Sequence, residues 1–119
     1  MPHRKWDLRI KDILASIDRI FEYTRNLDFE SFRSDTKTVD AVVRNFEIIG
    51  EAAAHLPVDL SVDHPEIPWQ DMRDMRNVLA HEYFGINEKI VWETLQNDLP
   101  PLVPMLKDLL RKQGLPDIL

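Results

Sequence analysis

The 119-residue sequence contains no cysteine, which excludes a disulfide framework, a thiolate metal site and a cysteine nucleophile. A reducing compartment fits this composition. No stretch approaches the roughly 20 consecutive apolar residues that a membrane span needs. The first ten residues, MPHRKWDLRI, are charged and lack the apolar run of a signal peptide. We therefore expect a soluble, cytoplasmic protein with no membrane partner.

The sequence also lacks an excess of basic residues. Its 15 Lys and Arg stand against 21 Asp and Glu, for a net charge of −6, so the chain repels phosphate backbones at long range. It has no basic strip studded with aromatic residues of the kind that reads single-stranded bases. A general nucleic-acid-binding protein is therefore disfavoured. A local cationic cleft stays compatible, because salt screens charges over roughly 10 Å.

Strand-like alternation, internal repeats and low-complexity tracts are absent as well. The length is that of one domain, long enough to bury a core without metal or disulfide staples. Apolar residues instead recur at helical spacing. We expect residues 1–119 to form a single all-α domain, an antiparallel bundle of about five helices.

The first two helices are predicted from apolar stripes. The first stripe ends at Thr24, and the polar stretch at 26–37 then breaks the period. Ser34 or Asp35 is the predicted N-cap of a second helix that runs to about His55. The two stripes comprise Trp6, Ile10, Ile13, Ile17, Ile20 and Thr24, and then Val39, Val42, Val43, Phe46, Ile49 and Ala53.

Near the end of the second helix, Gly50 precedes Glu51 and three alanines. This gives a thin stretch of helix that another backbone can approach closely. We expect an intimate helix contact there. Residues 56–67, which include two prolines and no helical period, are predicted to be a loop.

A third helix is predicted to start near Pro68 or Trp69 and to end between Tyr83 and Gly85. A fourth opens at Asn87. Its continuation must break or kink at the prolines of the segment 100–104, before a last amphipathic piece at 102–111.

The third helix places a cation among apolar residues. On a helical wheel, Arg76 shares one quadrant with Trp69, Met72, Leu79 and Tyr83. A guanidinium is costly there unless it is paired or faces a wet crevice.

A carboxylate is the plain explanation, and Glu51 is a candidate partner for Arg76. His81 lies about 140° around the same wheel from Arg76. If both residues act on one phosphate, either the helix deforms or the site forms across a two-fold interface. We therefore expect a homodimer.

Each of these residues also has a structural interpretation. A lone His81 near a helix end is most simply a cap or a satisfied polar residue. Tyr83 alone would be a core or interface residue, Arg76 half of an ion pair, and Asn77 a solvated helix residue.

The other histidines offer no metal site. His55 and His64 are most simply a helix-end residue and a loop residue. The spacing of His3, His55, His64 and His81 matches no metal-ligand pattern. No metal or other cofactor is therefore expected.

The stretch RNVLAHEY, with Arg76, four intervening residues, His81, Glu82 and Tyr83, resembles the R-x4-H-x-Y signature of the HepT-like toxins. These belong to the HEPN superfamily of α-helical ribonucleases. The resemblance extends to AVVRNFEIIGEAA at 41–53, to 67–77 and to 81–102, and so covers most of the chain.

The resemblance implies a metal-independent endoribonuclease, the toxin of a type VII-like toxin–antitoxin pair, that cleaves tRNA or mRNA. Arg76, His81 and Asn77 would line a cleft shared by two subunits. The implied partner is a minimal nucleotidyltransferase antitoxin that transfers AMP from ATP onto Tyr83.

The residue types suit this chemistry. RNA supplies its own nucleophile, the 2′-hydroxyl, so His81 would act as general acid or base. Arg76 would hold a phosphoryl oxygen as charge builds, and Asn77 would orient a phosphate or His81. The alternatives are a non-catalytic helical partner that regulates a nucleotidyltransferase, and a plain structural dimer.

Overall fold

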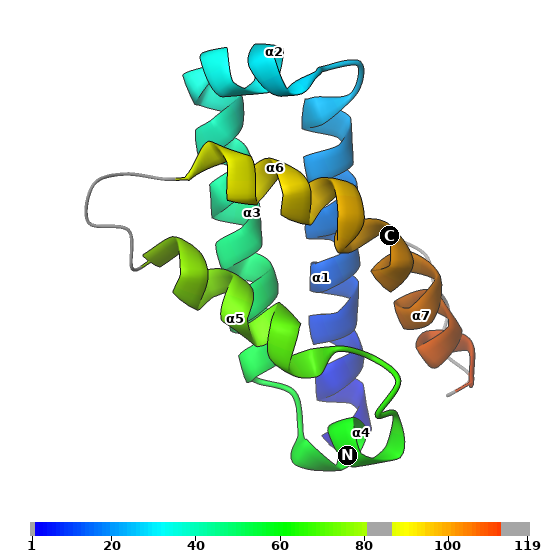
Figure 1. The fold of residues 1–119 in the computed structure, drawn as a ribbon. Helices are drawn as coiled ribbons and strands as arrows, with labels where there is room; N and C mark the ends of the chain where they lie inside the picture. The colour runs from blue at the N-terminus through cyan, green and yellow to red at the C-terminus, as the bar shows by residue number, and fades with distance from the viewer. Residues whose placement is uncertain (1, 81–86, 113–119) are drawn as a thin grey trace.

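The computed structural model describes residues 2–80 and 87–112, without the side chains of residues 2–5 and 77–80. Within these residues the chain forms seven helices and no strand (Figure 1). The predicted all-α class is therefore confirmed. The helix number exceeds the expected five because two short helices lie in segments whose helical period is too short to recognise.

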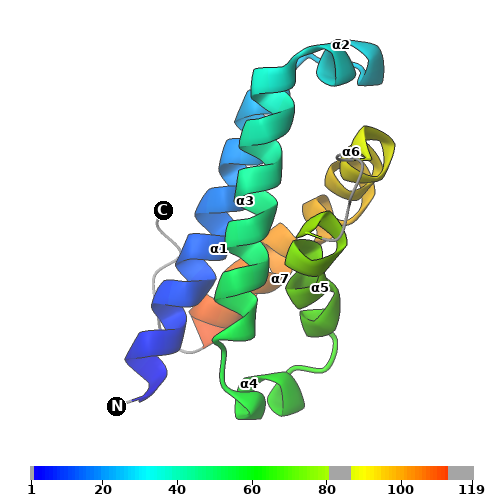
Figure 2. The ribbon, with the colours of Figure 1, turned by 90° about the vertical axis from the view of Figure 1, so that its left-hand side faces the viewer.

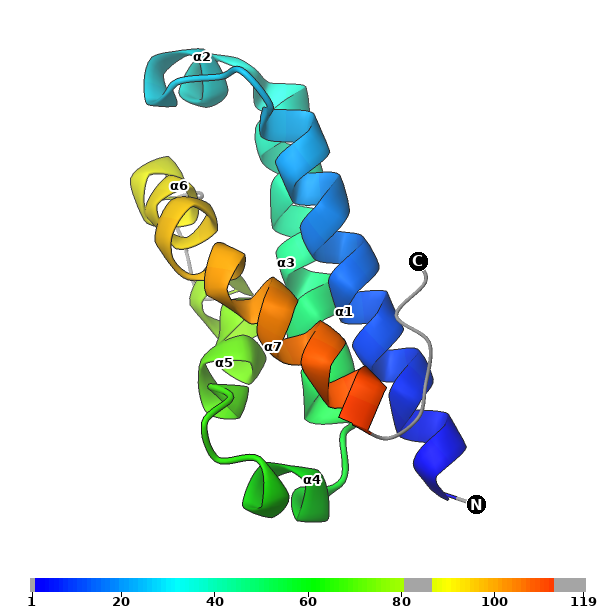
Figure 3. The same ribbon diagram turned by 90° about the vertical axis from the view of Figure 1, so that its right-hand side faces the viewer.

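Two long antiparallel helices, α1 (Pro2–Thr24) and α3 (Thr36–Ala54), form one layer. The second layer contains α5 (Trp69–Ala80), α6 (Glu88–Asn97) and α7 (Leu99–Lys112) and packs on one face of the pair (Figures 2 and 3). Of these, α5 contacts α3 and α7 contacts α1. The arrangement sets the motif-bearing helix α5 directly against α3.

The predicted apolar stripes form the core between the layers. On α1, Ile10, Ile13, Ile17 and Ile20 have no exposed surface. Burial of each such side chain contributes roughly 1.5–3 kcal/mol relative to exposure. Because this stripe is continuous over most of α1, the helix is held mainly by its packing.

Two aspartates cap helices near the turn between α1 and α3. Asp35 is the N-cap of α3, as predicted, and accepts hydrogen bonds from the backbone N–H of Thr38 at 3.2 Å and from its hydroxyl at 2.8 Å. Asp28 accepts from the backbone N–H of Ser31 at 2.8 Å. The side-chain hydrogen bond from Thr38 lowers the pKa of Asp35, and the backbone hydrogen bond from Ser31 lowers that of Asp28.

The interpretation of residues 56–67 as a loop was wrong in part, because α4 (Val58–Asp63) lies within them. Pro57 occupies its N-cap position and Leu60 is buried. One anchoring residue in a helix of six is too little to produce a recognisable period.

The polar stretch after α1 likewise contains a short helix, α2 (Phe29–Ser34). It is anchored by Phe32, which is fully buried and whose ring centroid lies 5.1 Å from that of Trp92 on α6. This contact joins the second layer to the end of the α1–α3 pair.

The expected break is present, but it lies at Asp98, before the prolines, and the last helix begins at Leu99, three residues before the predicted start. Pro100 and Pro101 occupy its first turn, where a missing N–H costs no helical hydrogen bond. Pro104 remains inside α7. No helix among residues 2–80 and 87–112 is long and apolar enough to cross a membrane.

Candidate functional site

The close contact predicted at Gly50 is present, and its partner is Arg76. A Cβ atom built on Gly50 would lie 2.7 Å from the Cβ of Arg76 and 2.8 Å from its backbone nitrogen. No real side chain tolerates such distances, so only glycine permits this approach of α3 to α5. The absent side chain thereby fixes where the backbone of Arg76 lies.

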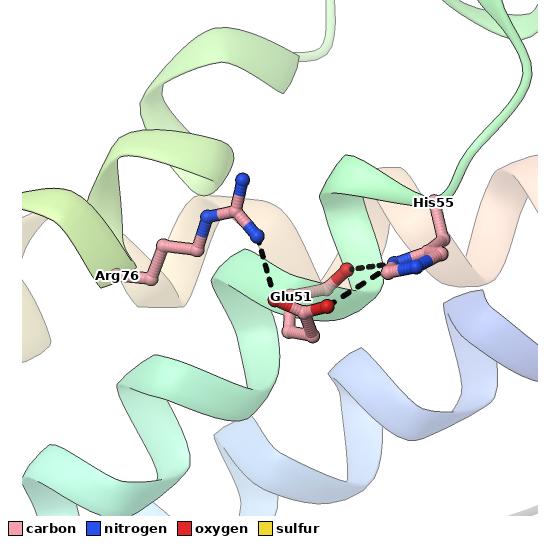
Figure 4. Close-up of polar contacts among 3 residues, drawn as sticks. All are labelled: Glu51, His55 and Arg76. Carbon is pink, nitrogen blue, oxygen red and sulfur yellow. Dashed lines mark hydrogen bonds and ion pairs between the residues drawn. The ribbon is translucent and has the colours of Figure 1, made fainter.

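The guanidinium of Arg76 reaches back across this contact to α3 (Figure 4). Its Nη1 donates a hydrogen bond of 2.6 Å to Oε1 of Glu51. The two side chains are 39% and 58% exposed, so the pair is not sealed from water. Trp69 and Met72, on the same stripe as Arg76, are buried.

Arg76 therefore packs its stem against Gly50 and keeps its charged end near solvent. Among the described side chains, Glu51 is the one that bonds the guanidinium. An arginine carries five N–H donors, and the described residues leave most of them open to a phosphate.

A third residue, His55, shares the carboxylate of Glu51. Its Nδ1 lies 3.5 Å from Oε2 of Glu51 and 2.8 Å from the backbone oxygen of the same residue. His55 is the C-cap of α3, which agrees with its interpretation as a helix-end residue. The link to Glu51 was missed, although the i, i+4 spacing of the two residues on a helix indicates such a pair.

The remaining predicted site residues cannot be placed beside this pair. The backbone of Asn77 belongs to α5, but its side chain, together with His81 and Tyr83, lies outside the described residues. The structure therefore brings together Arg76 and Glu51. The relation of His81 to Arg76 stays a prediction.

Comparison with known proteins identifies the family. A family model described as "Ribonuclease HepT-like" matches residues 13–109. The chain belongs to the HepT-like ribonuclease family. The matched region includes Glu51, Arg76, His81 and Tyr83, so the whole signature lies inside it.

Several relatives of this HepT-like chain carry names that refer to RNA cleavage. "Probable ribonuclease HepT" of Thermococcus cleftensis is 46% identical over 93 residues, which are 78% of this chain and 84% of the relative. "Putative RNase TTE0752" of Caldanaerobacter subterraneus is 38% identical over 104 residues, 87% of this chain and 93% of the relative. "Putative RNase MJ0127" of Methanocaldococcus jannaschii is 35% identical over 111 residues, 93% and 92% of the two chains. No solved structure matches the chain.

Two cavities of the HepT-like chain, of about 260 and 200 Å³, share Asp71, Met75 and Asp98 in their walls, and Arg76 is not among their described lining residues. Asp74 adds a further carboxylate to the larger one, and none of the described lining residues is basic. Carboxylates without cations repel phosphate, so these cavities are unsuited to an RNA backbone. Within the described part of the chain, no three His, Cys, Asp or Glu side chains come together as metal ligands.

Proposed function

We propose that this HepT-like chain is a metal-independent endoribonuclease, acting in the cytoplasm as a single helical domain. The observation that carries the proposal is the guanidinium of Arg76, which is held by Glu51 on one side and open to solvent on the other. It stands five residues before His81 in a family of ribonucleases. The relatives named as ribonucleases support RNA as the substrate, and we propose that this RNA is tRNA or mRNA.

The proposed reaction uses the 2′-hydroxyl of the substrate. The 2′-oxygen attacks the adjacent phosphorus while His81 takes its proton, and the bond to the 5′-oxygen breaks as that oxygen receives a proton. Negative charge builds on the non-bridging oxygens in the transition state. The free donors of Arg76 would stabilise that charge, and Asn77 would orient the phosphate or the imidazole.

The reaction needs a second group that gives a proton to the leaving oxygen, and a homodimer would supply it. On an ideal helix, His81 lies about 140° around the axis from Arg76, so one chain alone does not present both groups on one face. A two-fold interface would bring His81 of the partner subunit to the cleft and supply an acid in addition to a base. Sedimentation analysis that finds a monomer at working concentrations would count against this arrangement.

We further propose that the chain is the toxin of a type VII-like pair and that its nucleotidyltransferase antitoxin silences it. AMP attached to Tyr83, two residues after His81, would add bulk and negative charge that compete with the substrate phosphate. Mass spectrometry after incubation with the antitoxin and ATP should locate the added AMP on Tyr83. Growth arrest by this chain alone, relieved by its neighbouring gene, would test the toxin role in cells.

The decisive test of the nuclease is His81→Ala. Cleavage of RNA should be lost while the far-ultraviolet circular dichroism of the helices stays unchanged. His64→Ala, at the end of α4, is the matched control and should retain cleavage. Unchanged activity in His81→Ala would defeat the assignment.

A second candidate is a non-catalytic helical partner that regulates a nucleotidyltransferase. The net charge of −6 and the acidic cavities favour it, because both suit a protein partner better than RNA. In that case the purified chain would cleave no RNA, yet it would still bind the nucleotidyltransferase.

A further inference from the structure

His55 has one ring nitrogen committed and one available. The backbone oxygen of Glu51 can only accept a hydrogen bond, so Nδ1 of His55, 2.8 Å away, carries the proton of that contact. In the neutral ring this leaves the lone pair on Nε2, and in the protonated ring Nε2 is a second donor. Among the described residues, none is bonded to Nε2, and the side chain is 49% exposed. The ring is therefore oriented by α3 and free to bind a ligand through Nε2.

The charge balance around Glu51 indicates which ligand Nε2 of His55 would bind. Arg76 contributes one positive charge and Glu51 cancels it, so the pair alone is neutral toward an approaching phosphate. Donation from Nε2 to a phosphate requires the ring form in which both nitrogens carry a proton, and in that form His55, beside the second carboxylate oxygen, gives the row of three residues a net positive charge. In a chain of net charge −6, such a local excess is what an RNA backbone needs.

We propose that His55 is a phosphate-binding residue of the RNA site, contacting through Nε2 a backbone phosphate beside the one held by Arg76. This rests on the proposed nuclease function and extends it to a residue outside the R-x4-H-x-Y signature. Oε1 of Glu51 accepts from Arg76 and Oε2 faces His55, so one carboxylate lies between the two side chains (Figure 4). The role belongs to binding and not to proton transfer.

The first experiment is a titration of the full-length protein with inorganic phosphate, followed by the NMR resonances of the histidine rings. His55→Gln assigns its resonance. We expect a saturable shift of the His55 signal that weakens in Arg76→Ala, while the signal of His64, whose side chain is 16% exposed, serves as the internal control. A His55 signal that moves no more under phosphate than under sodium chloride of equal ionic strength would overturn the proposal.

The second experiment separates binding from the role of His55 as a helix cap. With bulk tRNA as substrate, His55→Ala should raise KM about five- to tenfold, with kcat within about twofold of the wild type. His55→Lys, which keeps a cation, should recover most of the loss in KM. His55→Asn, which keeps a side-chain N–H donor for the backbone oxygen of Glu51 but no cation, should recover thermal stability and not KM.

The two proposals fail in different ways. Cleavage that persists in His81→Ala, or no cleavage by the wild type, contradicts the nuclease, and the phosphate titration then still decides on His55. Cleavage that depends on His81, with the same KM in His55→Ala as in the wild type, contradicts only the role of His55.

Discussion

The carboxylate of Glu51 and the guanidinium of Arg76 meet across the α3–α5 interface, with Oε1 2.6 Å from Nη1. Both side chains are more than one-third exposed, so water screens the pair and its contribution to stability is about 0–1 kcal/mol. The contact uses few of the five guanidinium donors. Its value therefore lies in orienting Arg76 toward an open surface.

Loss of Glu51 should reduce activity far more than stability. In Glu51→Ala the guanidinium loses its orienting partner, and we expect kcat for RNA cleavage to fall about tenfold or more. Glu51→Gln keeps an oxygen acceptor for Arg76 and should lose less. The free energy of unfolding, measured in urea, should change by less than about 1 kcal/mol in either variant.

Glu47→Ala is the matched control, since Glu47 lies one turn earlier on α3 and pairs with Arg44 at 3.7 Å on the surface. It should leave kcat unchanged. A rise of kcat in Glu51→Ala would mean that Glu51 competes with the substrate for Arg76 and does not position it.

Arg76 should show the signature of a phosphate contact in its response to salt. Arg76→Ala removes one cation that faces the RNA, so the slope of log K against log salt concentration should become shallower by about 0.7. The value of kcat/KM should fall about 10²–10³-fold, as for the loss of one donor to a developing oxyanion. Arg76→Lys keeps the charge without the forked donors, and its kcat/KM should lie between those of the wild type and Arg76→Ala.

Arg73→Ala gives the comparison for Arg76. Arg73 lies one turn earlier on α5 and hydrogen-bonds Gln70 at 3.0 Å. Because it is also an arginine, its loss changes the net charge of the chain by the same amount. If both variants lose the same affinity, the effect reports general charge and no specific phosphate contact.

The fold was largely predictable because the core depends on long periodic stripes. The buried isoleucines of α1 and the N-cap Asp35 both follow from local rules that the sequence displays directly. The short helices α2 and α4 were not predictable. Each has six residues and is held by one buried side chain, Phe32 or Leu60, whose partners are distant in the sequence.

The site was predictable only in part, for a related reason. The apolar neighbours of Arg76 indicated that it needs a partner, and the thin stretch at Gly50 indicated a close helix contact. Neither observation could state that both features concern the same point, where Arg76 packs on Gly50 and bonds Glu51. That coincidence depends on how α3 and α5 cross, whereas the link of His55 to the same carboxylate lies within α3 and follows from the i, i+4 spacing of the two residues.

The N-cap Asp35 of α3 should make the stability of the fold depend on pH in the acidic range. Hydrogen bonds from Thr38 lower the pKa of Asp35 in the folded state below its ordinary 3.8. A lowered pKa means that this stabilisation is complete above about pH 4 and is lost as the pH falls through the folded-state pKa. Asp35→Ala should lower Tm at pH 7, and its difference from the wild type should shrink in that acidic range.

Two further variants isolate the cap from the charge. Asp35→Asn can still accept from Thr38 and should keep most of the stability at pH 7, without the acid-dependent part. Asp40→Ala removes an equal charge from an exposed position of the same helix and should change Tm little. If Asp40→Ala lowers Tm as much as Asp35→Ala does, the effect comes from helix charge and not from the cap.

Gly50→Ala should damage both the fold and the site. The added Cβ would meet the Cβ and backbone nitrogen of Arg76 at 2.7 and 2.8 Å, and neither atom can move without moving α5. Overpacking of this kind costs about 1–3 kcal/mol, against which the better helix propensity of alanine returns at most about 1 kcal/mol. We expect a lower midpoint of urea unfolding and a larger proportional loss of RNA cleavage, because the displaced Arg76 no longer reaches Glu51.

Ala54→Gly, at the end of the same helix, is the control for Gly50→Ala. It loses helix propensity without a clash and should retain cleavage. A Gly50→Ala protein as stable and as active as the wild type would show that the two helices can separate freely, and that the glycine does not set the position of Arg76.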